Sequence, residues 1–171
     1  KKRFRTLSLL LLIMTLLVTA IHPDLVKVRM SPYKSLPLYL NFPGAEHLKT
    51  LYSSYAQIDL FRSPAVRYAP GLSLNYTDPL PEQIGLAIDG DRIDVITDAR
   101  DRSGLRFLEF LPSAAAYRTG KINTVLILDP TGGLHVLMAE YYGARNIHKV
   151  ESNPMVINAV RDNYNEFSGQ I

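Results

Sequence analysis

The sequence predicts an α/β protein, and three patterns support that prediction. Two short segments, 84–88 and 92–96, flank an Asp-Gly turn and are typical of a β-hairpin. A continuous apolar run at 124–128 is typical of a strand that a parallel sheet buries on both faces. A helical period follows from 134 to 142, and 147–151 has the character of a second strand. We therefore expect a small antiparallel β subdomain followed by a βαβ unit.

The composition is that of a globular chain. The 171 residues are 47% hydrophobic and 20% charged and include no cysteine, which excludes a disordered tail and a disulfide scaffold. Four of the 19 Lys and Arg residues lie within residues 1–5, so the net charge of the remainder is near zero and nucleic acid is not an expected partner. Without cysteine, and with histidines at spacings that metal sites do not use, we expect no metal.

An apolar segment opens the chain. Residues 6–21 contain no charged side chain, and a basic cluster at 1–5 precedes them. This pattern predicts a transmembrane helix over residues 1–22, and hence a membrane location. Two alternatives stay open: a secretory signal peptide with 18–20 as its cleavage site, and a buried helix of a soluble core.

The rest of the chain divides by its pattern of prolines and strands. Residues 23–50 carry several prolines with basic residues between them and predict a connector. Residues 51–104 predict the β-rich subdomain, and residues 105–171 predict a partial nucleoside-binding domain. The last helix is expected to begin at Asn153 and Pro154, a cap residue followed by proline at the first helical position.

The turn between the two expected parallel strands has residues that suit a nucleoside. Asp129, Thr131, Gly132 and Gly133 follow the first strand, and glycine, which lacks a Cβ, lets a ligand approach the backbone closely. The helix that follows offers free N–H groups to an anion. Glu151, at the end of the second strand, can accept both hydrogen bonds from a ribose diol.

The turn departs from the usual nucleotide-binding fingerprints. Thr131 and His135 stand where glycines are usual, and Pro130 lacks an N–H group. The alternative interpretation is a tight packing turn between strand and helix that binds nothing, with Glu151 solvated at the strand end.

The same residues resemble a known family. Residues 125–133 and 149–154 resemble the first nucleotide-binding motifs of the spermidine synthase (polyamine aminopropyltransferase) family. Three upstream stretches are similar to that family's first strand, Leu-Asp-Gly hairpin and Tyr-His-Glu helix: 55–59, 87–91 and 107–111. With an apolar segment in front, the chain is similar to the membrane-fused, spermidine-synthase-like branch.

The resemblance implies a Rossmann-like fold of the S-adenosylmethionine-dependent methyltransferase type, of which this chain would hold the first βαβ unit. It also implies binding of S-adenosylmethionine, or its decarboxylated form, as co-substrate. In the family pattern Glu151 would hold the ribose, 129–133 would line the sulfonium nucleoside, and Gln57 and Glu109 would lie near a polyamine. The implied reaction is aminopropyl transfer, in which a primary amine attacks the carbon next to the sulfonium.

Departures from the family pattern keep a second function open. Leu108 replaces a family histidine, Asn153 replaces a common aspartate, and the catalytic aspartate would lie beyond Ile171. The alternative is a membrane-linked module that binds or senses the nucleoside without catalysis. A dinucleotide-dependent oxidoreductase is disfavoured by the missing fingerprint. The open edge expected of a short parallel sheet leaves homo-oligomer formation open as well.

Overall fold

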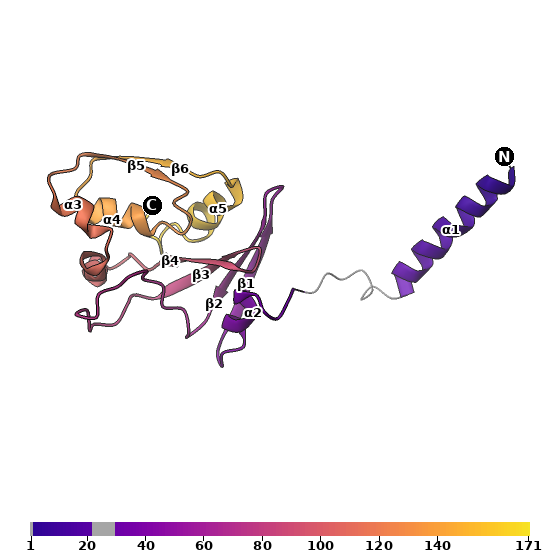
Figure 1. The fold of residues 1–171 in the computed structure, drawn as a ribbon, viewed down its shortest axis with the longest axis horizontal. Helices are drawn as coiled ribbons and strands as arrows, with labels where there is room; N and C mark the ends of the chain where they lie inside the picture. The colour runs from indigo at the N-terminus through magenta and orange to yellow at the C-terminus, as the bar shows by residue number, and fades with distance from the viewer. Residues whose placement is uncertain (1, 22–29) are drawn as a thin grey trace. The chain divides into compact units, whose positions relative to one another are not determined.

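The computed structural model describes residues 2–21 and 30–171 (Figure 1). The chain divides into two compact units, Lys1–Ser31 and Pro32–Ile171. Residue 1 and part of the expected connector, 22–29, lie outside the described residues.

The first unit contains helix α1 (Lys2–Ile21). Arg3 and Arg5 lie near its start, and the charge-free part that follows is about 24 Å long at ~1.5 Å per residue, shorter than the ~30 Å hydrocarbon core of a bilayer. Among the described residues, no helix has the length and apolar character needed to cross a membrane. The predicted transmembrane helix and the membrane location are therefore wrong. The signal-peptide and core-helix interpretations stay predictions.

A four-stranded antiparallel sheet forms one side of the second unit, in the order β1-β2-β3-β4. Its strands are β1 (Glu46–Tyr52), β2 (Gln57–Arg62), β3 (Gln83–Ile88) and β4 (Arg92–Thr97). The turn of the predicted β3–β4 hairpin has positive φ at Asp89 and Gly90, 51° and 71°, as a type I′ turn requires, and Asp91 N–H closes it on the Ile88 carbonyl at 3.1 Å. The short helix α2 (Ser35–Leu40) is tied to this turn, because Leu36 N–H donates to the Gly90 carbonyl at 2.9 Å.

A two-stranded parallel sheet forms the other side of this unit. Helix α4 (Leu134–Tyr141) connects its strands, β5 (Thr124–Leu128) and β6 (Asn146–Val150). The run at 124–128 was expected to be buried on both faces, but Leu126 and Leu128 are 62% and 68% exposed. The predicted fold class, a truncated Rossmann-like sheet behind a transmembrane helix, is therefore wrong. The fold is a mixed α/β arrangement with two separate sheets, and helices cover the parallel sheet on one face.

Shorter helices complete the second unit. A 3-10 helix, η2 (Arg102–Phe110), and α3 (Ala114–Arg118) precede β5; α5 (Pro154–Asn158) and a π-helix, η3 (Ala159–Asn163), follow β6. The predicted start of α5 is confirmed, since the Asn153 side chain accepts from Met155 N–H at 3.0 Å and Pro154 stands at the first position.

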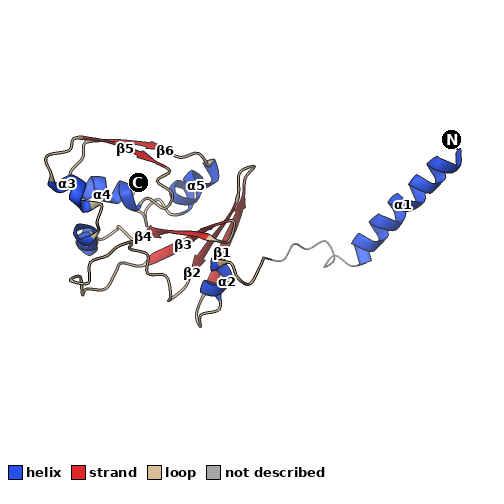
Figure 2. Cartoon of the chain, viewed as in Figure 1, coloured by secondary structure: helices blue, strands red, loops and turns tan. Residues whose placement is uncertain are grey.

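Helices α4 and α5 lie between the two sheets (Figure 2). Buried residues of the antiparallel sheet pack against Val156 and Val160 of α5 and η3. On the other side, Ile127 of β5 packs against Val136 of α4. Ile171, at the end of the chain, packs against both clusters. Strands β5 and β6 and the C-terminal residue are thus brought to one place.

Candidate functional site

The turn after β5 has a strained backbone. Asp129 and Thr131 have positive φ angles of 47° and 49°, which are costly for residues other than glycine, and Gly133 has a φ of 92°. Two hydrogen bonds hold the turn in this shape: Gly133 N–H donates to the Pro130 carbonyl at 2.8 Å, and Thr131 Oγ1 donates to the Asp129 carbonyl at 3.1 Å. Strain that neighbouring contacts maintain is a mark of functional sites, so this turn is the candidate site.

The two glycines of the turn have different neighbours. A Cβ at Gly132 would collide with the backbone carbonyl of Val95, so this glycine lets the turn pack directly on β4. A Cβ at Gly133 would collide with the side chain of Ile171, and its φ also favours glycine. The sequence predicted that both glycines admit a ligand, yet Gly132 faces protein. Gly133 borders a cavity.

Asp94, on β4, is a site residue that the sequence analysis missed. Its carboxylate accepts hydrogen bonds from Val95 N–H at 2.7 Å and from Gly132 N–H, so it joins the turn to the antiparallel sheet. Burial raises the pKa of Asp94 above its ordinary value, although these two backbone donors oppose the rise. The sequence feature that could have identified Asp94 is an acidic residue within a predicted strand, at the position that pairs with the core residue Leu86.

Glu151 follows β6 and bonds to both sides of the site. One carboxylate oxygen accepts from Thr131 N–H at 3.3 Å, and the other accepts from Asn153 N–H at 2.9 Å. The side chain therefore connects the turn after β5 to the start of α5. It is not merely solvated at a strand end, as the alternative interpretation of the sequence supposed.

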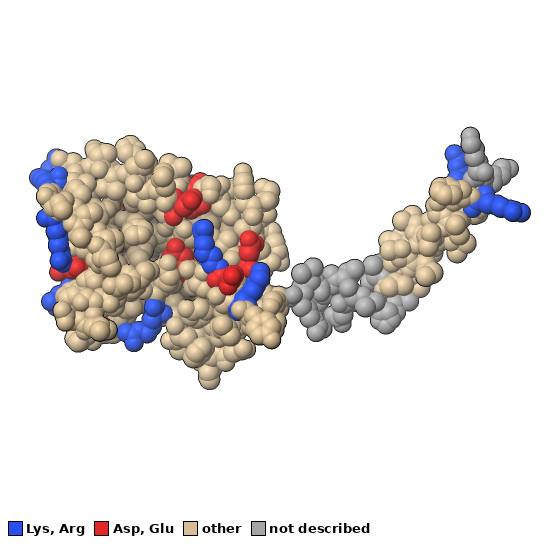
Figure 3. Space-filling view, in the orientation of Figure 1, with Lys and Arg blue, Asp and Glu red and all other residues tan. Residues whose placement is uncertain are grey.

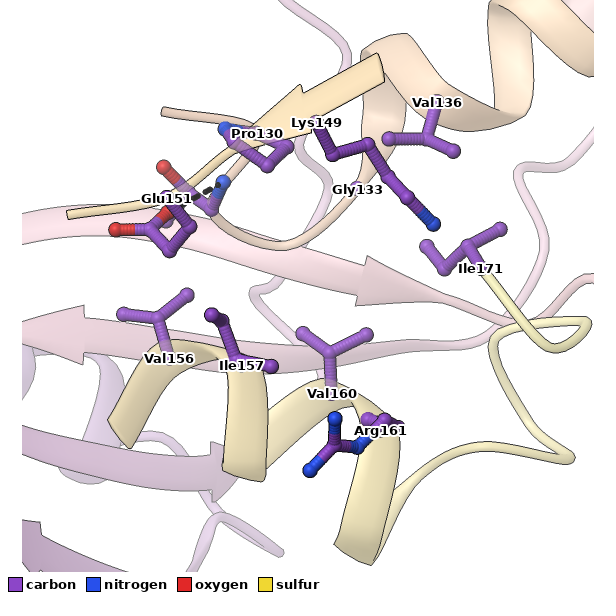
Figure 4. Close-up of a pocket in the computed structure, with 11 residues that line it drawn as sticks. Pro130, Gly133, Val136, Lys149, Glu151, Val156, Ile157, Val160, Arg161 and Ile171 are labelled. Atoms are coloured by element: carbon purple, nitrogen blue, oxygen red, sulfur yellow. Dashed lines mark hydrogen bonds between the residues drawn. The ribbon is translucent and has the colours of Figure 1, made fainter. Parts of the chain in front are cut away.

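A cavity of about 280 Å³ lies beside the turn, close to the lower end of the usual size range of ligand pockets. One wall is apolar and is formed by Val136, Val156, Ile157, Val160 and Ile171. Figure 4 shows these side chains converging from α4, from α5 with η3, and from the end of the chain.

The polar part of the lining comes from the turn, from β6 and from η3. Thr131, Lys149, Glu151 and Arg161 supply it. In Figure 4, Glu151 lies at one side of the cavity, while the ammonium of Lys149 points toward the side where Ile171 lies. The cavity thus combines an apolar wall with a few polar groups, which is the usual character of a small-molecule site.

Comparison with known proteins assigns no family. No protein-family model, curated protein or solved structure matches this chain. The resemblance to spermidine synthases therefore stays a prediction, and the geometry of the site has to support any functional proposal.

Gln57 lies outside this cavity. Its side-chain amide donates to Asp59 at 2.8 Å, and its backbone N–H donates to Asp89 at 2.9 Å. Asp59 is 2% exposed and also accepts from Thr50 Oγ1 at 2.6 Å, while His47 lies 2.9 Å away. Gln57 therefore belongs to a hydrogen-bonded network between β1 and β2.

Glu109, on η2, also lies outside the cavity lining. Its carboxylate accepts a hydrogen bond from the Tyr141 hydroxyl of α4. This bond, followed by burial, raises the pKa of Tyr141 to about 12. Glu109 thus joins η2 to α4, and the structure does not bring it together with Gln57 or with the turn.

Charges elsewhere on the second unit form exposed pairs. Arg62 lies 3.2 Å from Glu82, and Arg102 lies 3.0 Å from Glu140. Figure 3 shows Lys and Arg beside Asp and Glu at several places on the face drawn. Such exposed pairs contribute about 0–1 kcal/mol each. Within the part of the chain that the structure describes, no group of three or more His, Asp or Glu could hold a metal ion.

Proposed function

We propose that this chain binds a sulfonium nucleoside, S-adenosylmethionine or its decarboxylated form, in the cavity beside the glycine turn. The observation that supports this most is the position of Glu151, whose carboxylate lines the cavity at the end of β6. An ionised carboxylate offers about four lone-pair sites. The backbone amides of Thr131 and Asn153 occupy two of them, which leaves acceptors for the two hydroxyls of a ribose.

The apolar wall suits the other half of a nucleoside. An adenine ring removes apolar surface from water when it lies against valine and isoleucine side chains, and each Å² removed contributes about 25 cal/mol. Val156 and Ile157 of α5 stand beside Glu151 in the lining, so a base and a ribose have adjacent places (Figure 4).

Binding without catalysis is the role that we favour over aminopropyl transfer. A transferase needs a base that takes the proton of the attacking amine. Among the lining residues the one carboxylate is Glu151, and the proposal assigns its free acceptor sites to the ribose. Gln57 and Glu109, which the resemblance places near a polyamine, are engaged elsewhere.

Titration calorimetry on the full chain tests the proposal. S-adenosylmethionine and 5′-methylthioadenosine, which shares its adenosine part, are titrated into the wild type, Glu151→Gln and Glu166→Gln. Glu151→Gln should weaken both ligands by about 1.5–3 kcal/mol, roughly ten- to a hundredfold, because a charged acceptor is lost. Glu166→Gln, an exposed change outside this cavity, is the matched control. Absence of binding to the wild type, or equal affinities of Glu151→Gln and wild type, would contradict the proposal.

A further inference from the structure

The cavity carries two cationic side chains that the nucleoside itself does not require. Ile147, Lys149 and Glu151 alternate along β6 and its end, and residues two apart on a strand share a face. Ile147 packs against α4 and fixes this face as the inner one. Lys149 and Glu151 are therefore directed toward the cavity, as Figure 4 shows.

Neither cation is neutralised by a strong partner. Within the described residues, the Lys149 ammonium has no hydrogen bond or ion pair. Arg161 approaches Asp162, its neighbour in sequence, at 3.0 Å, and both side chains are more than half exposed, so this pair holds the guanidinium weakly. The one carboxylate in the lining, Glu151, serves the turn and the start of α5.

We infer that the cavity selects the carboxylate-bearing sulfonium nucleoside, S-adenosylmethionine, over its decarboxylated form. This inference rests on the proposed function and specifies its ligand. Lys149 and Arg161 bind the carboxylate of the amino-acid part, while Glu151 holds the ribose.

The charges of the two ligands differ by the one group that these cations recognise. S-adenosylmethionine carries a carboxylate, an ammonium and a sulfonium, and so has one net positive charge. The decarboxylated form keeps both cations and loses the anion. In the cavity it would place its ammonium near Lys149 and Arg161 without a carboxylate of its own to pair with them. Like charges a few ångströms apart repel each other even in water. Free polyamines, which are cations, are disfavoured for the same reason.

Titration calorimetry with three ligands on the full chain measures this selection. The ligands are S-adenosylmethionine, its decarboxylated form and 5′-methylthioadenosine, which has neither the carboxylate nor the ammonium. We expect S-adenosylmethionine to bind about tenfold tighter than the decarboxylated form, a ratio that one hydrogen bond to a charged group supplies. Methylthioadenosine should lie between them.

Substitutions assign the selection to the two cations. Lys149→Gln and Arg161→Gln should each weaken S-adenosylmethionine and leave methylthioadenosine unchanged, and together they should remove the preference. Lys121→Gln and Arg145→Gln, exposed changes outside the lining, are the matched controls.

The outcomes separate this inference from the proposed function. If methylthioadenosine and both sulfonium forms bind with equal affinity, or if the decarboxylated form binds best, the inference is overturned and the nucleoside site stands. If the three ligands all fail to bind the wild type, the proposed function fails and the inference fails with it.

Discussion

Gly132→Ala is the substitution whose effect follows most directly from the structure. The added methyl group would collide with the carbonyl oxygen and carbon of Val95, backbone atoms of a buried strand that have no rotamer to change. The turn would have to move away from β4, and the hydrogen bond from Gly132 N–H to Asp94 would be lost. Overpacking costs about 1–3 kcal/mol, and a shielded carboxylate that loses a donor adds about 1–3 kcal/mol. We expect a total loss of roughly 2–6 kcal/mol.

Urea unfolding of the full chain, followed by circular dichroism, measures this loss, and each kcal/mol lowers Tm by about 2–4 °C in a chain of this size. Gly120→Ala is the matched control, because a Cβ there meets no atom within 4 Å. That change should be neutral or stabilise the protein by about 0.4–1 kcal/mol. Equal unfolding midpoints for the two variants would refute the packing of the turn on β4.

Two further pairs of substitutions test the electrostatics and the layers. Burial raises the pKa of Asp94 above 3.8. The contribution of Asp94 to the free energy of unfolding, measured against the Asp94→Asn variant, is therefore present at acid pH and is lost as pH rises through the raised pKa. Arg100 lowers the pKa of Asp98. The contribution of Asp98 to the free energy of unfolding, measured against Asp98→Asn, therefore has the opposite pH dependence: it is present above pH 3.8 and is lost on acidification. Urea unfolding at about pH 3 to 7 tests both signs, and parallel profiles would contradict them. Ile127→Ala should cost about 2–4 kcal/mol and the exposed Leu126→Ala less than about 0.5 kcal/mol, with equal losses contradicting the one-sided sheet.

Local patterns predicted the strands and helices better than their assembly. The run at 124–128 and the helix from Leu134 lie where the apolar period placed them, because that period depends on near neighbours in sequence. The predicted fold class was wrong because fold class depends on which faces of the strands and helices pack against each other. The sequence of β5 does not encode that α4 covers the face with Val125 and Ile127 and leaves Leu126 and Leu128 exposed.

The same distinction holds at the site. The sequence put Glu151 beside the turn, since the ends of neighbouring parallel strands meet at one edge of a sheet. It did not reveal that Asp94 and Val95, from a different sheet, contact Gly132. Lys149 was missed because a lysine on a strand is usually solvated, and its direction became informative only when Ile147 fixed the inner face.

The contacts that form the cavity are also contacts that hold the two sheets together. The turn is bonded to β4 through Asp94, to the end of β6 through Glu151, and packs on Ile171 through Gly133. A change that moves the turn away from β4 should therefore weaken nucleoside binding along with stability, although Gly132 does not line the cavity. A ligand that binds only the folded state should in turn raise the unfolding midpoint with its concentration. Gly132→Ala is then expected to lower nucleoside affinity and stability together, whereas Gly120→Ala should change neither by more than about 1 kcal/mol. A variant at Gly132 that lost stability but kept full affinity would show that the cavity forms independently of the contact between the turn and β4.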